Sequence, residues 1–282
     1  MFKAGYVAIV GLPNAGKSSL VNTLVGEKVA IISSKPQTTR ENIIGIVNGE
    51  DYQIILVDTP GVHHSKNALD KVMMKNVRSA VSGVDLVVYL LDGTKQPDQE
   101  EIEYIDHLPE PKIVVKTKID LKEQKNFKND IEVSSRTGEN IDKLKAMILS
   151  YLPTYEQEHY IYDKDFYTDK SIKFLIAEEI REKALNLLRA EVPHGIAVEI
   201  IRFYEEEKVV YIDADIVCEN ERHKGMIIGK GGQTLKKIGS EARNFAEHLL
   251  DKKVMLKLFV KVEKNWRDNP NKIKSLGLNG WM

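Results

Sequence analysis

The sequence has only one cysteine among its 282 residues, so it can form neither an internal disulfide nor a cysteine-rich metal site. Cys218 lies in the strand-like run 209–218, where we expect it to be a small buried hydrophobic residue and not a nucleophile. No apolar run approaches the length of a membrane-spanning helix, and the N-terminus lacks the layout of a signal peptide. We therefore expect a cytoplasmic protein.

The chain also has almost no net charge, −1 at pH 7, so its overall balance excludes no class of partner. The distribution of charge is nevertheless uneven. Residues 222–274 hold 14 Lys and Arg against 5 Asp and Glu, a net charge of +9, which leaves −10 on the remainder. This asymmetry predicts an anionic partner for the C-terminal part, and the length of the chain suggests two domains.

The strongest motif is the segment 11–18, Gly-Leu-Pro-Asn-Ala-Gly-Lys-Ser, which joins a predicted buried strand to a predicted helix. In that context the pattern G-x-x-x-x-G-K-[ST] predicts a phosphate-binding loop rather than an ordinary turn. The loop amides and the helix N-terminus would face the phosphates, and Gly16 would let the backbone bend around them. Lys17 would lie near the β- and γ-phosphates, and Ser18 would bind Mg²⁺.

Two further segments are expected at the same site. The polar segment 33–40 contains adjacent threonines, and we favour Thr39 over Thr38 as the one that reaches Mg²⁺ and the γ-phosphate. Asp58 ends a predicted buried strand and can hold a Mg²⁺-bound water, while Gly61 can offer its amide to the γ-phosphate. The predicted catalytic residues are therefore Lys17, Thr39 and Gly61, and the predicted metal-binding residues are Ser18, Thr39 and Asp58.

A guanine site is predicted at the ends of two later strands, where doubly wound sheets bind their ligands. Asp120 can accept hydrogen bonds from both N1–H and the exocyclic amine of guanine, and the aliphatic stem of Lys118 can lie along the base. Taken singly, such residues could be helix caps, but their order along the chain favours a nucleotide site. The predicted nucleotide-binding residues are Asn14, Ala15, Gly16, Lys17, Ser18, Ser19, Asp58, Gly61, Thr117, Lys118, Asp120, Ser134, Ser135 and Arg136.

The pattern of elements predicts an α/β P-loop GTPase domain over residues 1–153, with a doubly wound and mostly parallel sheet. Its last short strand is expected at 133–136. Residues 154–170 have no clear periodicity but are rich in tyrosine, so we expect a linker that docks on the protein. A second domain, 171–282, is predicted to have the order α-β-β-α-α-β and a basic C-terminal tail. Its first helix is expected over 171–189, and its last strand over 254–262.

A glycine loop, 225–232, lies between the two middle helices of this second domain. Its Gly-Lys-Gly-Gly sequence matches the G-x-x-G clamp of KH domains, although glycines between helices often only make a turn. Basic residues lie on both sides, and the apolar residues 226–228 could line a groove for unstacked bases. The predicted RNA-binding residues are Arg222, Lys224, Gly225, Met226, Ile227, Ile228, Gly229, Lys230, Gly231, Gly232, Lys236 and Lys237.

Together, the segments 11–18, 36–40, 58–61, 117–120 and 225–232 resemble the Era family, bacterial Ras-like GTPases with a C-terminal type II KH domain. The resemblance implies a GTP/GDP switch that acts in assembly of the 30S ribosomal subunit, with the 3′ end of 16S rRNA bound in the KH groove. It also implies a cytoplasmic monomer that can associate weakly with the inner membrane. Other interpretations are an RNA-binding module whose nucleotide site is regulatory, and a membrane-linked cell-cycle GTPase.

Two residues depart from the usual GTPase pattern. Thr117 replaces the asparagine of the fourth motif, which affects affinity more than guanine selectivity. Val62 replaces the glutamine that orients water in Ras proteins, so we expect slow intrinsic hydrolysis. Our hypothesis is that a K⁺ ion placed by Asn14 completes the site. His63 and His64 follow, and we interpret them as solvent-exposed loop residues rather than bases.

Overall fold

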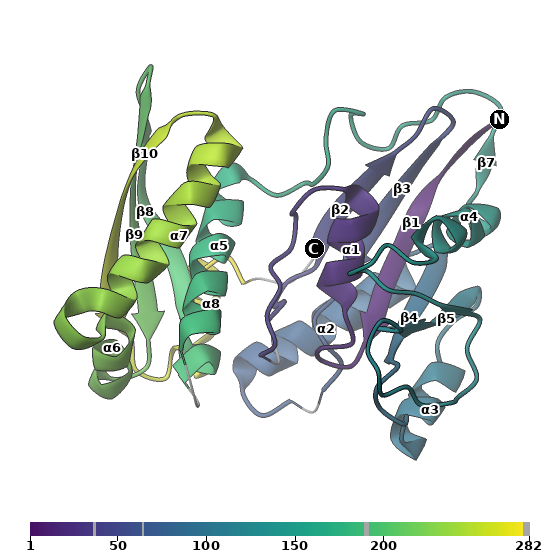
Figure 1. Cartoon of the computed structure of the whole chain (residues 1–282), viewed down its shortest axis with the longest axis horizontal. Helices are drawn as coiled ribbons and strands as arrows, with labels where there is room; N and C mark the ends of the chain where they lie inside the picture. The colour runs from purple at the N-terminus through teal and green to yellow at the C-terminus, as the bar shows by residue number, and fades with distance from the viewer. Residues whose placement is uncertain (36–37, 64, 189–191, 279–282) are drawn as a thin grey trace.

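The computed structural model describes residues 1–35, 38–63, 65–188 and 192–278. The chain forms two α/β units side by side (Figure 1), an N-terminal unit drawn in purple to teal and a C-terminal unit drawn in green to yellow. After β7 (Thr154–Tyr155), a segment without helix or strand crosses from the first unit to the second.

The first unit contains a sheet with the strand order β2-β3-β1-β4-β5-β6, and β7 pairs with β1. The β2–β3 and β1–β7 pairs are antiparallel and the others are parallel. The strands are β1 (Phe2–Gly11), β2 (Ile43–Asn48), β3 (Tyr52–Asp58), β4 (Leu86–Asp92), β5 (Lys112–Thr117) and β6 (Ile131–Glu132), and the helices are α1 (Lys17–Val25), α2 (Ala68–Ser82), α3 (Gln99–Asp106) and α4 (Ile141–Tyr151).

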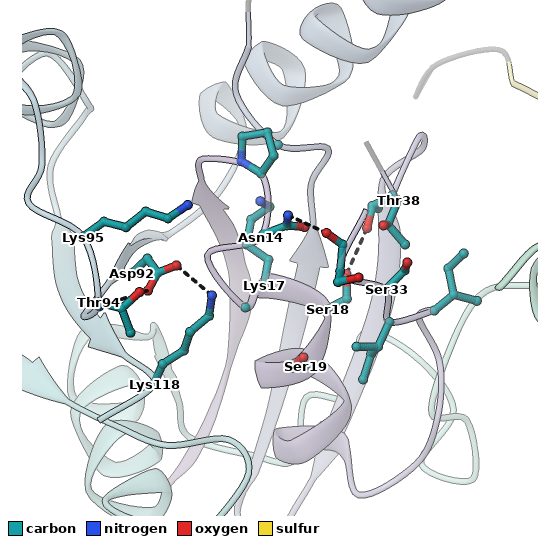
Figure 2. A pocket seen from close by; sticks show the side chains of 17 residues that line it. Asn14, Lys17, Ser18, Ser19, Ser33, Thr38, Asp92, Thr94, Lys95 and Lys118 are labelled. Atoms are coloured by element: carbon teal, nitrogen blue, oxygen red, sulfur yellow. Dashed lines mark hydrogen bonds and ion pairs between the residues drawn. The ribbon is translucent and has the colours of Figure 1, made fainter. Parts of the chain in front are cut away.

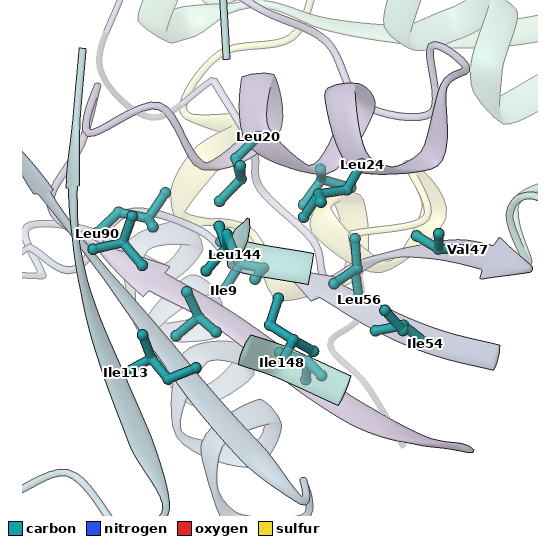
Figure 3. Packing of buried hydrophobic residues seen from close by; sticks show 14 of the residues in the cluster. Ile9, Leu20, Leu24, Val47, Ile54, Leu56, Leu90, Ile113, Leu144 and Ile148 are labelled. Carbon is teal, nitrogen blue, oxygen red and sulfur yellow. The ribbon is translucent and has the colours of Figure 1, made fainter. Parts of the chain in front are cut away.

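Helices cover both faces of this sheet, which explains why its central strands are nearly continuous apolar runs. Leu20 and Leu24 of α1 and Leu144 and Ile148 of α4 pack on one face (Figure 3). Helices α2 and α3 cover the opposite face. The parallel order brings the carboxyl ends of β1, β3, β4 and β5 to one edge, where the predicted nucleotide residues lie.

The second unit contains a three-stranded sheet of order β10-β9-β8, with β10 parallel and β8 antiparallel to β9. The elements confirm the predicted α-β-β-α-α-β order. They are α5 (Ile172–Leu187), the 3₁₀ turn η1 (Val192–Gly195), β8 (Ala197–Glu205), β9 (Val209–Cys218), α6 (Glu221–Ile228), η2 (Lys230–Gly232), α7 (Gln233–Leu250), β10 (Lys253–Val262), η3 (Trp266–Asp268) and α8 (Pro270–Ser275).

Three sequence-based boundaries need correction. The glycine loop is shorter than predicted, because Gly225–Ile228 form the last turns of α6 and only Gly229–Gly232 lie between the helices. The strand predicted at 133–136 is β6, Ile131–Glu132, so residues 133–136 follow the strand instead of forming it. The predicted helix 171–189 ends at Leu187, and Arg189 lies outside the described residues. Cys218 is a fully buried free thiol, as expected.

The segment after β7 docks on the first unit, as its tyrosines led us to expect. The side-chain oxygen of Gln53 accepts hydrogen bonds from the backbone amides of Ile161 and Tyr162. The amide of Ile46 in β2 donates to the carbonyl oxygen of Tyr167 at 3.0 Å. These contacts fix the path of the chain between the two units.

The C-terminal segment returns from the second unit to the first. The indole of Trp266 is fully buried in a cluster that includes Leu69 and Met73 of α2, and its Nε1 donates to the carbonyl oxygen of Gly195. The Ala68 amide, at the start of α2, donates to the Asp268 carboxylate. The two units thus share buried surface beside the nucleotide site. None of the helices in the described part of the chain is both long and apolar enough to cross a membrane.

Candidate functional site

The side chain of Lys17 folds back and bonds the backbone of the phosphate loop. Lys17 begins α1, and its Nζ donates to the carbonyl oxygens of Gly11 and Leu12 at 3.0 and 2.9 Å. Burial lowers the pKa of Lys17 to about 8, although Asp58 opposes this shift. A β-carbon on Gly11 would lie 2.6 Å from the carbonyl oxygen of Leu90, so only glycine fits there. The loop therefore places a cation beside backbone amides at the N-terminus of a helix, the arrangement that binds phosphate.

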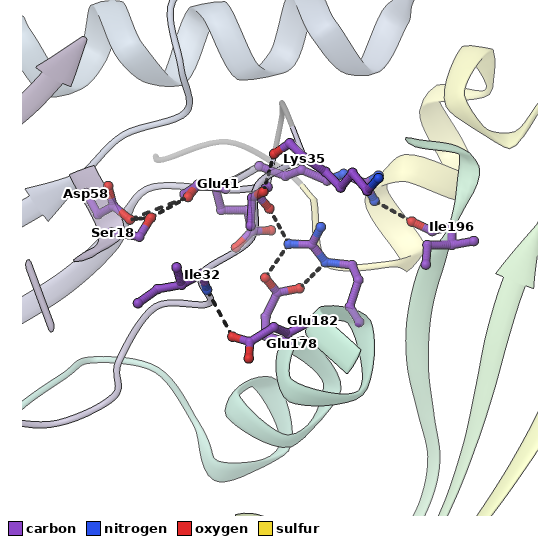
Figure 4. Close-up of polar contacts among 12 residues, drawn as sticks. Ser18, Ile32, Lys35, Glu41, Asp58, Glu178, Glu182 and Ile196 are labelled. Atoms are coloured by element: carbon purple, nitrogen blue, oxygen red, sulfur yellow. Dashed lines mark hydrogen bonds and ion pairs between the residues drawn. The ribbon is translucent and has the colours of Figure 1, made fainter. Parts of the chain in front are cut away.

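Three oxygen-bearing side chains meet beside this lysine (Figure 4). The Ser18 hydroxyl donates to Asp58 Oδ2 at 2.6 Å, and it lies 2.9 Å from the Thr39 hydroxyl, which is itself 3.5 Å from Asp58. Burial raises the pKa of Asp58 to about 6, against the opposing effects of its Ser18, Lys17 and Thr39 neighbours.

These three side chains fit a hard divalent cation. Mg²⁺ prefers oxygen ligands and usually keeps several waters. Asp58 Oδ1 is buried and has no hydrogen-bond partner in the described part of the chain, so it could accept from a metal-bound water. The hydroxyl of Thr38 is turned to the carbonyl oxygen of Lys35 at 2.6 Å, which favours Thr39 as the ligand.

Gly61 lies against the phosphate loop, because a β-carbon added to it would lie only 2.8 Å from the backbone of Pro13. The next amide, of Val62, donates to the Gly11 carbonyl oxygen at 3.1 Å. The expectation that His63 is a solvent-exposed loop residue is wrong. Its Nδ1 lies 2.7 Å from the Gly61 carbonyl oxygen and its Nε2 lies 3.4 Å from Asp70, which anchors the ring to α2. His64 lies outside the described residues.

A cavity of about 520 Å³ lies above these groups (Figure 2) and is large enough for a nucleotide. Asn14, Gly16, Lys17, Ser18, Ser19, Thr39, Gly61 and Lys118 all line it, as the sequence predicted. It is also lined by Ser33 and Ser34, which lie in the polar segment expected at this site, and by Asp92, Thr94 and Lys95, which sequence reasoning missed. Asp92 ends a buried strand, so its position was a signal that could have been used.

Of the predicted guanine-binding residues only Lys118 lines this cavity, whereas Asp120, Ser134 and Arg136 contact one another outside its lining. The Ser134 hydroxyl donates to Asp120 Oδ1 at 2.6 Å, and Arg136 forms an ion pair with the other carboxylate oxygen. The hydrogen bond from Ser134, with a smaller contribution from Arg136, holds the pKa of Asp120 below its usual value. Lys118 pairs with Asp92 at 2.7 Å, which fixes its stem along the wall of the cavity.

Thr117 is fully engaged within the protein. Its hydroxyl lies 2.8 Å from the carbonyl oxygen of Ala15 and 3.1 Å from that of Leu91. A hydroxyl has one proton to donate, so this side chain ties the phosphate loop to β4 and has no proton left for a base. The carbonyl oxygen of Ser135 lies 3.2 Å from the Thr23 hydroxyl of α1, which also lies 2.8 Å from the carbonyl oxygen of Ser19.

The glycine loop of the second unit is exposed and strongly curved. Gly229, Gly231 and Gly232 have φ angles of 73°, 58° and 77°, which L-residues rarely adopt. Lys230, Lys236 and Lys237 are exposed beside it, and so are Arg222 and Gly225, while Lys224, Ile228 and Gly232 are half-buried. Net positive charge next to a backbone without side chains suits the approach of a sugar-phosphate chain.

One predicted RNA-binding residue is wrongly placed. Ile227 is completely buried in the core of the second unit with Ile238 and Ala242, because it lies on the inner face of α6. Its side chain therefore cannot line a groove for bases. Met226 is 39% exposed and stays available at the surface.

The comparisons with known proteins agree with this geometry. Residues 6–118 match the family model of the 50S ribosome-binding GTPases, and residues 191–267 match that of KH domains. The chain is 43% identical to GTPase Era of Clostridium acetobutylicum and 44% identical to GTPase Era of Clostridium perfringens, each over 98% of both chains. The chain belongs to the GTPase Era family.

Two solved Era structures extend this assignment to the whole fold. One contains MgGDPNP and nucleotides 1506–1542 of 16S ribosomal RNA, and it matches with a TM-score of 0.93 at 35% identity over 99% of each chain. The other, a single-residue variant of Aquifex aeolicus Era bound to GDP·AlF₄⁻, matches with a TM-score of 0.92 at 35% identity over 98% of this chain and 99% of that one. The chain is thus an Era-family GTPase, a P-loop GTPase unit followed by a KH domain.

Proposed function

We propose that this GTPase is a switch whose nucleotide state controls how its KH domain binds the 3′ end of 16S rRNA during assembly of the 30S subunit. In this proposal residues 1–153 are the switch, 154–170 the linker and 171–282 the RNA-binding domain. The observation that supports it best is the meeting of Ser18, Thr39 and Asp58 directly beside the boundary between the two units. The relative solved with a 16S rRNA fragment supports the choice of RNA.

The roles of the residues follow from their positions. Lys17 and the loop amides bind the phosphates, Ser18 and Thr39 would hold Mg²⁺, and Asp58 would accept from its bound water. Bound Mg²⁺ would supply positive charge to offset the charge that develops on the transferred phosphoryl group. Gly61 would donate its amide to the γ-phosphate, and its place is fixed by Pro13.

A second part of the proposal is that GTP hydrolysis requires a K⁺ ion in addition to Mg²⁺. Val62 has no group that can orient water, so the chemistry requires charge stabilisation from elsewhere. Asn14 donates its side-chain amide to the Ser34 carbonyl oxygen at 2.9 Å, which leaves its amide oxygen and nearby carbonyl oxygens as ligands for K⁺. Equal hydrolysis rates of the pure protein in NaCl and KCl would eliminate this part of the proposal.

The test of the switch is the affinity for a short single-stranded RNA with the sequence of the 16S rRNA 3′ end. It is measured with a GTP analogue, with GDP and without nucleotide, at one fixed salt concentration. Tighter binding with the GTP analogue alone would support coupled domains, because a switch requires a difference in affinity between states. Equal binding in all three conditions would instead favour an RNA-binding module with an independent nucleotide site.

Cytoplasmic action with weak attachment to the inner membrane is a further part of the proposal that is open to test. The C-terminal residues 222–274 carry a net charge of +9, which would attract both RNA and anionic lipid. Sedimentation with anionic liposomes, in the presence and absence of the RNA, distinguishes the two. Competition by RNA would show that the same surface serves both, and absence of sedimentation would remove the membrane from the proposal.

A further inference from the structure

The segment that carries Thr39 is held from the RNA-binding side. The Thr39 hydroxyl lies 2.9 Å from that of Ser18 and 3.5 Å from Asp58, whereas both neighbouring residues contact the second unit. The carbonyl oxygen of Thr38 accepts a hydrogen bond from Arg181 Nη2 of α5. The guanidinium of Arg40 donates to the carbonyl oxygens of Ile196 and His194 at 2.6 and 3.0 Å.

We propose that Arg181 of the KH domain, together with Arg40, is a positioning residue for the GTP site that fixes Thr39 at the metal-binding position. This inference rests on the role of Thr39 given above. Three consecutive residues alternate between the two units, so the position of one hydroxyl at the nucleotide site depends on two guanidinium groups at the domain boundary.

Both guanidinium groups are tightly confined. Arg181 is 2% exposed and donates to both carboxylate oxygens of Glu178, through Nε at 2.7 Å and through Nη2, and Nη2 also donates to the Thr38 carbonyl oxygen. Arg40 is 5% exposed and lies 5.5 Å from the centre of the Trp266 ring. Because both side chains are buried and hydrogen-bonded, neither can easily change its conformation. A shift of α5 should therefore move Thr38 through Arg181, and a shift of η1 should move the segment through Arg40.

Two buried cations at close range are costly, which argues that their placement serves a purpose. Burial, and then the charge of Arg181, lowers the pKa of Arg40 to about 9, so Arg40 is still protonated at neutral pH. One nitrogen of each guanidinium, Nε of Arg40 and Nη1 of Arg181, lacks a hydrogen-bond partner within the described residues. A boundary selected only for stability would be better served by apolar contacts.

The earlier part of the same segment is anchored on α5 as well. Lys28 forms ion pairs with Glu179 and Glu182 at 2.6 and 2.9 Å, and the Ile32 amide donates to the other oxygen of Glu182 at 2.9 Å. Glu179 and Glu182 are 2% and 6% exposed, so the carboxylates of these pairs are buried while the Lys28 side chain is 33% exposed. Lys28, Ile32 and Thr38 therefore all contact one helix of the KH domain, α5.

The test uses the full-length variant Arg181→Met and compares its affinities for GDP and for a non-hydrolysable GTP analogue, both with Mg²⁺. Loss of a hydrogen bond from a charged group should weaken binding of the GTP analogue about tenfold. GDP lacks the γ-phosphate that Thr39 serves, so its affinity should change less than about twofold. Equal losses for both nucleotides would overturn the proposal, because they would indicate a general structural defect.

Two further variants keep the test decisive. Arg181→Lys keeps the charge but cannot bond Glu178 and Thr38 with a planar fork, so it should show a smaller loss of the same selectivity even if Arg181→Met folds poorly. The matched control is Arg202→Gln, which breaks an ion pair with Asp213 at 3.1 Å between strands β8 and β9. It should leave both nucleotide affinities unchanged, and an effect equal to that of Arg181→Lys would contradict a specific role.

A double-mutant cycle with Thr39→Ala separates this inference from the proposed function. If Arg181 acts through Thr39, Arg181→Met should have no further effect on GTP-analogue affinity in the Thr39→Ala background. Additive losses would overturn the inference. A Thr39→Ala protein with unchanged GTP-analogue affinity would instead overturn the metal-site assignment itself.

Discussion

The protein has two glycine-rich loops that bind or are expected to bind phosphate groups, and they use glycine for different reasons. The phosphate loop is buried, and a β-carbon on Gly11 would strike the backbone of β4. The KH loop is exposed, and a β-carbon on Gly231 would meet nothing within 4 Å. In the first loop glycine makes room, and in the second it permits a backbone conformation.

This contrast shows how each loop meets its ligand. The phosphate loop is tied down by Lys17 and by Thr117, so its amides are pre-organised for one ligand geometry. The KH loop is closed by short-range backbone bonds, from the Gly229 amide to the Gly225 carbonyl oxygen and from the Gly232 amide to the Gly229 carbonyl oxygen. A loop of this kind can adapt to an irregular single strand, and its affinity comes mainly from surrounding charge.

The largest effect is expected at Gly11. Gly11→Ala would place a methyl group 2.6 Å from the Leu90 carbonyl oxygen at a φ of 152°, so the backbone must move. We expect the free energy of unfolding to fall by about 3 kcal/mol or more. Denaturant unfolding measures this, with Gly83→Ala as control, because Gly83 has a φ of −128° and its nearest neighbour lies at 3.9 Å. Equal stability of the two variants would show that the loop tolerates a side chain.

A second large effect concerns Asp58, whose pKa burial raises to about 6. The nucleotide-free folded state holds the Asp58 proton more tightly than the unfolded state, so stability from this group is lost as pH rises from about 4 to 6. Without nucleotide, Asp58→Asn should therefore be about 2–3 kcal/mol more stable than the parent at pH 7.5, and the gain should vanish near pH 4. Unfolding in denaturant at both pH values provides the measurement.

The control for this prediction is Asp92, whose pKa is shifted in the opposite direction to that of Asp58. At Asp92 burial raises the pKa, but hydrogen bonds from Lys118 and Thr94 outweigh it and leave the pKa below its usual value. Asp92→Asn should therefore bring no gain in stability at pH 7.5. With MgGTP present, Asp58→Asn should also lose its advantage, since the metal-bound water then loses its acceptor. A gain that persists with MgGTP would mean that Asp58 does not serve the metal.

The sequence predicted local motifs well because their chemistry is contained in a few adjacent residues. Lys17 begins the helix after one buried strand and Asp58 ends another, and that context determines where they lie. The prediction for Ile227 was wrong because its neighbouring glycines suggested a loop, whereas helix α6 continues to Ile228 and places Ile227 on its buried face. Long-range pairs left no signal. Arg181 is 143 residues from Thr38, and only the folded chain shows that the two are in contact.

A smaller effect, about 1 kcal/mol, is expected at the KH loop. Gly231→Ala forces an alanine to a φ of 58° without any clash, so the free energy of unfolding should fall by about 1–2 kcal/mol. Gly225→Ala should have the opposite sign, a gain of about 0.5–1 kcal/mol, because Gly225 lies within helix α6 in open space. Thermal or denaturant unfolding of the pair tests both signs. A loss in both would mean that α6 is not a continuous helix up to Ile228.

The smallest effect should come from single lysines beside the KH loop, and it addresses where the RNA lies. Lys236 is exposed on the first turn of α7, and Lys257 is exposed on β10. Of the two, only Lys236 lies next to the glycine loop. If RNA binds at that loop, Lys236→Gln should lower the slope of log affinity against log salt by about 0.7, the contribution of one phosphate contact on a single strand. Lys257→Gln should leave the slope unchanged, although it removes the same charge from the same domain.

Filter binding at several salt concentrations gives both slopes. A smaller slope for Lys257→Gln alone would place the strand on the opposite face, and the exposed glycine loop would then be only a turn.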